Sequence, residues 1–291
     1  MNNNSYIQKN NVFAGVNFAF LVIFYIIINF VIRFVLNSTL KQGTAIYQSC
    51  AMLISPIALL TCLLVSKKVK KQKMVELFCI KKFSPVYLIF ALLISFGMFF
   101  GLGKANDWFI GILSKIGLKV GDGSLSINGV GEYILFIFII CLLPALLEEC
   151  FFRGILLFSL KSSGKIFAVL VSAICFSLYH LNFAQFLYQF IYGAFLGALA
   201  LACKSVIPSI ITHFINNFVL LTLIYLKVNN DIFILPLIII GCIVLVFSAI
   251  CLILKLRKEK TQKQEPKHSF FIPFGILGVV VSLLVMISGA I

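Results

Sequence analysis

The chain has 291 residues, of which 62% are hydrophobic and only 11% are charged, and its mean hydropathy is +1.11. A soluble domain of this size has no use for so much apolar surface, whereas a bundle of bilayer-spanning helices does. The formal net charge of +15 would suit nucleic-acid binding if it were spread over one surface. The basic residues instead cluster between apolar runs, so we expect an integral membrane protein and no nucleic-acid partner.

Nine apolar runs predict transmembrane helices, and the fold class is therefore an all-α polytopic transmembrane helix bundle of about nine spans. The first run is too long for a cleaved signal peptide and has no small-x-small cleavage site, so we interpret it as a signal anchor. The predicted spans are 12–36, 44–66, 84–103, 132–160, 165–181, 184–203, 207–227, 232–254 and 270–291.

The basic clusters predict the orientation of the spans. With a cytoplasmic N-terminus, the loops 67–82 and 255–268 both face the cytoplasm and the C-terminus lies outside. Seventeen Lys and Arg residues then lie on the cytoplasmic side, six lie outside and Arg153 lies within the membrane. Cytoplasmic loops of membrane proteins carry this excess of positive charge, which is attracted to anionic lipid. We expect a multi-pass protein, of the plasma membrane if the source is bacterial, with the lipid bilayer as a partner.

The longest connection, 104–131, is not plainly polar. Its first part, KANDWFIGILSKIGLKV, predicts either a helix in the outer membrane interface or an ordinary outer loop. Its end, GDGSLSING, is typical of a turn. Small residues four apart, such as Gly97 with Gly101 and Gly193 with Gly197, predict closely packed helices.

The stretch LLEECFFRGIL places three charges inside the fourth span, where each is costly. Glu149 and Arg153 are four residues apart, so a salt bridge can close between them on a helix. Glu148 is turned about 100° from Glu149 and has no obvious local partner. Pro144 removes a backbone donor four residues before Glu148 and predicts a kink near the acids.

Two histidines also lie in apolar runs. His180 falls in CFSLYHLN and His213 in ITHFINNF. Asn217 follows His213 by one helical turn and shares its face, whereas Asn216 is expected to point elsewhere. Helix rise from the cytoplasmic lysines places these groups and Glu148 at a similar depth. A polar core that only holds helices together is one interpretation, but two acids, two histidines and an Asn in one layer favour a site that activates water.

Three motifs in order resemble those of one known family. EECFFRG (148–154) resembles an EExxxR motif, FSLYH (176–180) an FxxxH motif and HFINN (213–217) an HxxxN motif. Together they resemble the CAAX-processing and bacteriocin-processing membrane proteases, the CPBP or Abi family of type II CAAX prenyl endopeptidase-like enzymes. The resemblance covers roughly 132–225, and the spans before and after it carry no matching motif.

The resemblance implies an intramembrane endopeptidase with its catalytic core in spans four to seven. Its substrate would be a membrane-associated protein or peptide, processed in the manner of CAAX proteins, bacteriocins or signal peptides. The chain then divides into an N-terminal part with three transmembrane helices and an outer loop (1–131), a protease core (132–227) and a C-terminal part with two transmembrane helices and a basic cytoplasmic loop (228–291).

The resemblance also implies roles for single residues. Glu148 would deprotonate the attacking water while His180 helps to hold that water. His213 and Asn217 would donate hydrogen bonds to the oxyanion. Two further charged residues of the EExxxR motif would support the site, namely Glu149 and Arg153.

Other interpretations stay open at this stage. No cofactor is favoured, but a zinc enzyme with Glu148, His180 and His213 as ligands is an alternative. A proton-coupled transporter would also use buried Glu and His, although the sequence has no convincing inverted repeat. A bacteriocin self-immunity or regulatory membrane protein without essential proteolysis is the third alternative.

Overall fold

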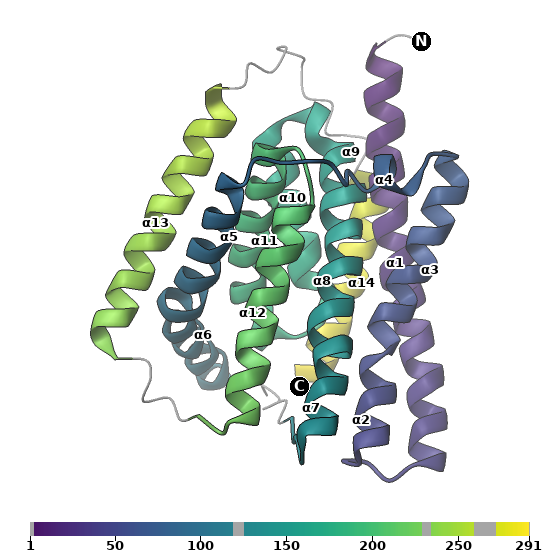
Figure 1. The fold of residues 1–291 in the computed structure, drawn as a ribbon. Helices are drawn as coiled ribbons and strands as arrows, with labels where there is room; N and C mark the ends of the chain where they lie inside the picture. Colours follow the sequence, from purple (N-terminus) through teal and green to yellow (C-terminus); the bar gives the residue numbers. More distant parts are fainter. Residues whose placement is uncertain (1–2, 119–124, 229–233, 259–271, 291) are drawn as a thin grey trace.

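A computed structural model describes residues 3–118, 125–228, 234–258 and 272–290, and these residues form a bundle of helices without strands (Figure 1). The prediction of an all-α polytopic bundle is confirmed. Much of the predicted loop 255–268 and the first part of the GDGSLSING turn lie outside the described residues.

Apolar helices occupy all nine predicted spans. Within the described ranges, seven helices are long and apolar enough to cross a membrane, and two shorter apolar helices fall on the fifth and ninth predicted spans. The chain is therefore an integral membrane protein, while the number of crossings and their orientation stay predictions. The seven helices are Ile7–Thr39, Ala45–Lys70, Val86–Lys115, Val130–Ser163, Phe183–Cys203, Ile207–Tyr225 and Leu235–Lys258, and the two shorter ones are Lys165–Tyr179 and Phe274–Gly289.

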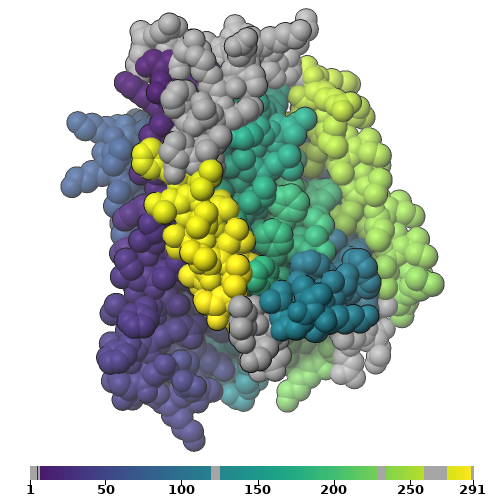
Figure 2. Space-filling view, turned by 180° about the vertical axis from the view of Figure 1, so that it is seen from behind, coloured from purple at the N-terminus to yellow at the C-terminus, as the bar shows by residue number. Residues whose placement is uncertain are grey.

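The N-terminal third consists of helices of different lengths, and the last of them runs in a different direction from the others. Its elements are α1 (Asn3–Thr39), α2 (Ala45–Met52), α3 (Ile54–Lys70), α4 (Met74–Leu77), α5 (Val86–Gly97), the π-helical η1 (Met98–Leu102) and α6 (Gly103–Lys115). Of the two interpretations of the connection after α5, the structure shows the helix, while its place in the outer membrane interface stays a prediction. Figure 2 shows α6 running across the lower end of the bundle rather than along its length.

The fourth span alternates between α-helical and π-helical turns. It comprises α7 (Val130–Phe136), η2 (Ile137–Leu142), α8 (Leu143–Glu148), η3 (Glu149–Leu157), α9 (Phe158–Leu160) and the 3-10 turn η4 (Lys161–Ser163). Pro144 has no backbone N–H to donate, so the regular α-helical ladder cannot continue through it. The expected disturbance takes the form of π-helical turns on both sides of α8, a feature that often accompanies functional sites.

The remaining helices enclose this span. They are α10 (Lys165–Tyr179), α11 (Phe183–Cys203), α12 (Ile207–Tyr225), α13 (Leu235–Lys258) and α14 (Ile272–Ala290). The expected close packing at small residues is confirmed. A Cβ on Gly193 would lie 3.1 Å from the Cα of Ala173, and one on Gly101 would lie 2.8 Å from the backbone of Gly241. In Figure 1, α8 lies between α3 on one side and α12 on the other, and both helices contact it.

Candidate active site

The fully buried side chain of Arg153 ties η3 to its neighbours. Its Nη1 donates to Glu149 Oε1 over 2.9 Å and its Nη2 donates to the Gly193 carbonyl of α11 over 3.1 Å. The guanidinium also stacks on the Phe176 ring of α10, with 4.3 Å from its carbon to the ring centroid. The predicted Glu149–Arg153 ion pair is confirmed, and the Arg153 side chain also contacts α10 and α11.

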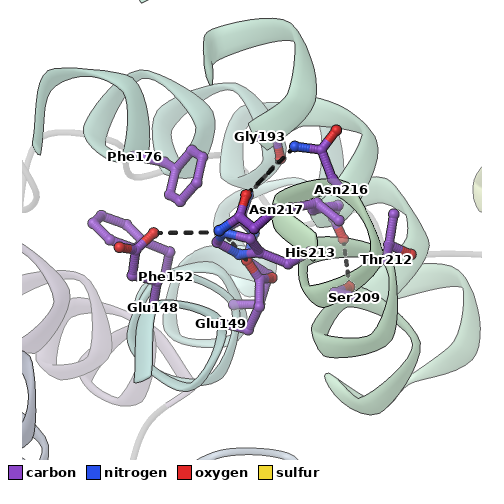
Figure 3. Close-up of polar contacts among 12 residues, drawn as sticks. Glu148, Glu149, Phe152, Phe176, Gly193, Ser209, Thr212, His213, Asn216 and Asn217 are labelled. Carbon is purple, nitrogen blue, oxygen red and sulfur yellow. Dashed lines mark hydrogen bonds and ion pairs between the residues drawn. The ribbon is translucent and has the colours of Figure 1, made fainter. Parts of the chain in front are cut away.

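His213 lies between the two glutamates (Figure 3). Its Nδ1 is 2.9 Å from Glu149 Oε1, and its Nε2 is 3.9 Å from Glu148 Oε2. An ionised carboxylate only accepts hydrogen bonds, so Nδ1 carries the hydrogen and donates it to Glu149. The nearest partner of Glu148 therefore comes from α12, far along the chain, and sequence spacing could not have named it.

Glu148 differs from Glu149 in how its oxygens are used. Glu149 Oε1 accepts from both Arg153 and His213. Oε2 of each glutamate is buried and has no hydrogen-bond partner within the described part of the chain, and Glu148 alone of the two lines the cavity described below. An unpartnered buried carboxylate oxygen is costly, because it has lost water without gaining a donor. The side chain of Glu148, unlike that of Glu149, therefore combines an unpartnered oxygen with a place on the cavity wall.

His180 is held by the backbone of its own helix. Its Nδ1 is 2.8 Å from the Phe176 carbonyl, and its ring meets the Phe176 ring edge-on with 4.9 Å between centroids. A carbonyl oxygen can only accept, so Nδ1 is the protonated nitrogen in this contact. In the neutral imidazole, Nε2 then carries a lone pair.

Pro144 explains how Asn217 is anchored. Because proline has no N–H, the Ile140 carbonyl four residues earlier lacks the donor that residue 144 would otherwise supply in an α-helix. Asn217 Nδ2 donates to this carbonyl over 3.0 Å. The residue that disturbs the helix before the acids therefore also creates the acceptor that fixes the Asn217 amide.

A chain of hydrogen bonds continues from Asn217 to α11. Asn216 Nδ2 donates to Asn217 Oδ1 over 3.5 Å, and the Tyr188 hydroxyl donates to Asn216 Oδ1 over 2.7 Å. The expectation that Asn216 points elsewhere is wrong. Its helical angle does differ from that of Asn217, but the site curves around α12 toward α11, and both amides border it.

One cavity of about 840 Å³ unites the predicted residues. Glu148, His180, His213 and Asn217 all line it, whereas Glu149 and Arg153 are absent from its wall and lie behind it. The sequence analysis missed the α11 wall, where Gln185, Tyr188 and Gln189 also line the cavity. Their spacing of three and four residues puts polar groups on one face of an otherwise apolar helix, and this signal could have identified them.

Within the described residues, the three side chains of the zinc alternative are not grouped as metal ligands. No group of three or more His, Cys, Asp or Glu side chains in this part of the chain is arranged to hold a metal ion. Glu148, His180 and His213 thus share a cavity without forming a three-ligand centre.

Fold and site together define a polytopic membrane protein with a glutamate–histidine site inside the bundle. The family model of the type II CAAX prenyl endopeptidase Rce1-like proteins matches residues 130–219. This range contains all three motifs and every predicted site residue, so the match confirms the resemblance on which their roles rest. None of the curated proteins compared with the chain matches it.

Proposed function

We propose that the protein is an intramembrane endopeptidase that hydrolyses a peptide bond of a membrane-associated protein or peptide, with Glu148 as the residue that activates water. One observation carries the proposal. Glu148 Oε2 is buried, has no hydrogen-bond partner among the described residues and lies 3.9 Å from His213 Nε2 beside a cavity. The Rce1-like family match supports the same class of reaction.

The spacing between Glu148 and His213 suits a bound water. A distance of 3.9 Å is too long for a direct hydrogen bond, and in the proposed reaction a water bridges the two atoms. His180 lines the same cavity, and its Nε2 lone pair provides a further acceptor. Glu149 is not placed for this role. Its Oε2 is also without a partner within the described ranges, but its Oε1 accepts from Arg153 and His213 and its side chain does not line the cavity.

The charges of the site balance during the proposed reaction. Arg153 offsets the charge of Glu149 throughout, as suits a buried ion pair. Glu148 takes a proton from water as the resulting hydroxide adds to the peptide carbonyl. The negative charge moves from Glu148 to the oxyanion, so the net charge of the site does not change.

His213 and Asn217 provide the donors for that oxyanion. His213 donates from Nε2 while its Nδ1 hydrogen stays on Glu149. Asn217 uses one hydrogen of Nδ2 for Ile140, and the second hydrogen is available to the oxyanion. Glu148 then returns its proton to the leaving nitrogen as the C–N bond breaks, which restores the starting carboxylate.

Comparison of membrane peptides from two strains tests this function. One strain carries chromosomal Glu148→Gln, and the matched control carries Glu132→Gln, a half-buried acid at the start of the same span that does not line the cavity. We expect uncleaved precursors to accumulate with Glu148→Gln and not with Glu132→Gln. Identical peptides in both strains would refute the proposal and favour transport. An immunity phenotype that survives Glu148→Gln would favour the non-proteolytic role.

The proposed reaction uses no metal. We therefore expect the detergent-purified protein to cleave its substrate at an unchanged rate after treatment with a chelator and removal of bound metal. Activity lost on chelation and restored by zinc would overturn this part of the proposal, while the hydrolase assignment would remain.

A further inference from the structure

The cavity is closed at one end. Glu148 and His213 are only 5% and 4% exposed. From Glu148 toward Lys161 the fourth span is packed solid, because Phe152, Leu156, Leu157 and Leu160 have no solvent-exposed surface. Ser209 of α12 is equally buried, and its hydroxyl donates to the Leu196 carbonyl of α11. A substrate cannot reach the two catalytic side chains from this end.

The cavity is open at the opposite end. Its wall extends to α6 and to the last turns of α12, which lie together at the lower end of the bundle in Figure 1. Here the lining residues are exposed, including Asp107, Ile224, Lys227 and Val228. The Asp107 carboxylate is 3.5 Å from Lys104 Nζ, and both side chains reach solvent. Access to the site therefore runs from the α6 end.

The two ends also differ in charge. Among the described residues, five Lys or Arg lie toward the open end, namely Arg33, Lys41, Lys104, Lys115 and Lys227. Fourteen lie toward the closed end, namely Lys9, Lys67, Lys68, Lys70, Lys71, Lys73, Lys81, Lys82, Lys161, Lys165, Lys204, Lys255, Arg257 and Lys258. Positive charge collects on the cytoplasmic side of membrane proteins, so the closed end faces the cytoplasm.

We propose that the cavity opens to the non-cytoplasmic side of the membrane. Its substrates are accordingly segments of exported or membrane-anchored polypeptides at the non-cytoplasmic boundary, and not segments that lie in the cytoplasm. The cleavage of such segments rests on the proposed function, whereas the side of access does not. On the access route, α12 presents the exposed aliphatic side chains of Leu220 and Ile224 beside Lys227. This surface suits a segment that leaves the apolar membrane core for water.

Cysteine labelling in intact cells tests the side of access without any need for proteolysis. Lys227→Cys and Asp107→Cys each place a thiol at the open end, and Lys68→Cys places one at the closed end as a matched control. All three positions are exposed, so the variants are expected to fold. The chain with its own nine cysteines sets the background for a membrane-impermeant maleimide.

We expect both open-end cysteines to be labelled in intact cells, and Lys68→Cys to be labelled only after the cells are permeabilised. The reverse pattern would overturn the proposal. Gln189→Cys in the cavity wall provides a second measurement with a small impermeant thiosulfonate. Reaction in intact cells supports a continuous path from outside to the cavity, and reaction only after permeabilisation contradicts it.

The peptide comparison separates this inference from the proposed function. If precursors accumulate in the Glu148→Gln strain, their cleavage sites should lie at the non-cytoplasmic boundary. Cleavage sites in cytoplasmic segments would refute the side of access and leave the hydrolase assignment standing. No accumulation at all, together with labelling of Lys227→Cys from outside, would refute the hydrolase and leave the side of access standing.

Discussion

Two regions of this bundle bury polar side chains, and they do so in different ways. Between α1 and α3, the Ser66 hydroxyl hydrogen-bonds to Asn17 Oδ1 and lies 2.7 Å from the Cys62 carbonyl. Asn17 Nδ2 in turn donates to the Phe13 carbonyl. This pair is neutral, and neither side chain lines the cavity described above. In the region from α8 to α12, by contrast, the buried groups include charges and leave oxygens without partners at a cavity.

The difference shows that burial of polar groups does not by itself mark a functional site in a membrane protein. Satisfied neutral pairs hold helices together. Unsatisfied acceptors beside charged groups and a cavity are costly, and the bundle keeps them where a substrate or water supplies the missing partner. The predictions below test this distinction, because residues of the first kind should affect stability and those of the second kind activity.

The largest expected effect is that of Glu148→Gln on turnover. The amide keeps the size of the side chain but cannot accept a proton, and a positioned general base contributes about 10²–10⁴ in rate. We expect at least a 100-fold loss of cleavage with unchanged amounts of folded protein, measured on the purified protein. Activity above a tenth of that of the unmodified chain would contradict the role of Glu148 as a base.

Arg153→Ala should damage the fold as well as the reaction. It leaves Glu149 as a buried charge without its cation, and breaking a buried pair costs about 3–5 kcal/mol. We expect less protein in the membrane and a lower unfolding temperature in detergent, with Glu149→Ala behaving alike. The exchange Glu149→Arg with Arg153→Glu should not restore activity, because Glu149 also accepts from His213. Normal stability of both single variants would show that the pair is not structural.

Sequence spacing predicted the interactions within one helix and could not predict those between helices. The Glu149–Arg153 pair follows from a separation of four residues, and helix rise alone brought Glu148, His180 and His213 to one depth. The contact of His213 with both glutamates depends on how α12 packs against α8 and η3. The same holds for the hydrogen bond from Asn217 Nδ2 to the Ile140 carbonyl. Both contacts join segments that are remote in sequence.

The π-helical turns and the shape of the cavity also could not be predicted from the sequence. Pro144 indicated a disturbance, but a proline can be accommodated by a kink or by widened turns, and the packing of neighbours decides between them. Asn216 was misplaced because helical angle was taken as the only criterion. The cavity extends from α12 to α11, so two faces of α12 line it, and Asn216 and Asn217 both border it.

Asn217→Ala should lower turnover by roughly two to three powers of ten, the range for removal of an oxyanion donor. It also leaves the Ile140 carbonyl without the Asn217 donor, so a modest loss of stability is expected in addition. Steady-state kinetics should place the main effect in kcat rather than KM. An effect confined to KM would show that Asn217 binds substrate without stabilising the transition state.

Tyr188→Phe should have a smaller effect through Asn217. The Tyr188 hydroxyl donates to Asn216 Oδ1. This bond fixes the Asn216 side chain so that its Nδ2 donates to Asn217 Oδ1, which orients the Asn217 amide. Loss of one such bond is worth about 0.5–1.5 kcal/mol, and we expect a 2- to 10-fold fall in kcat with little change in KM. The decisive comparison is with Asn217→Ala as background. There Tyr188→Phe should have no further effect on kcat, and an additive loss would show that Tyr188 acts independently of Asn217.

The smallest effect is predicted for Ser66→Ala, which tests the other region. The hydroxyl has one hydrogen, and Asn17 Oδ1 and the Cys62 carbonyl are its two possible acceptors. Hydrogen bonds between membrane helices average about 0.6 kcal/mol. We expect a slightly lower unfolding temperature and a cleavage rate within about twofold of the unmodified chain. The loss is small because Asn17 still donates to the Phe13 carbonyl. Measurement of both quantities on the same preparation compares the two regions directly. A tenfold loss of cleavage without a loss of stability would mean that the pair between α1 and α3 serves the reaction. Hydrogen-bond satisfaction would then fail to distinguish structural polar groups from those of the active site.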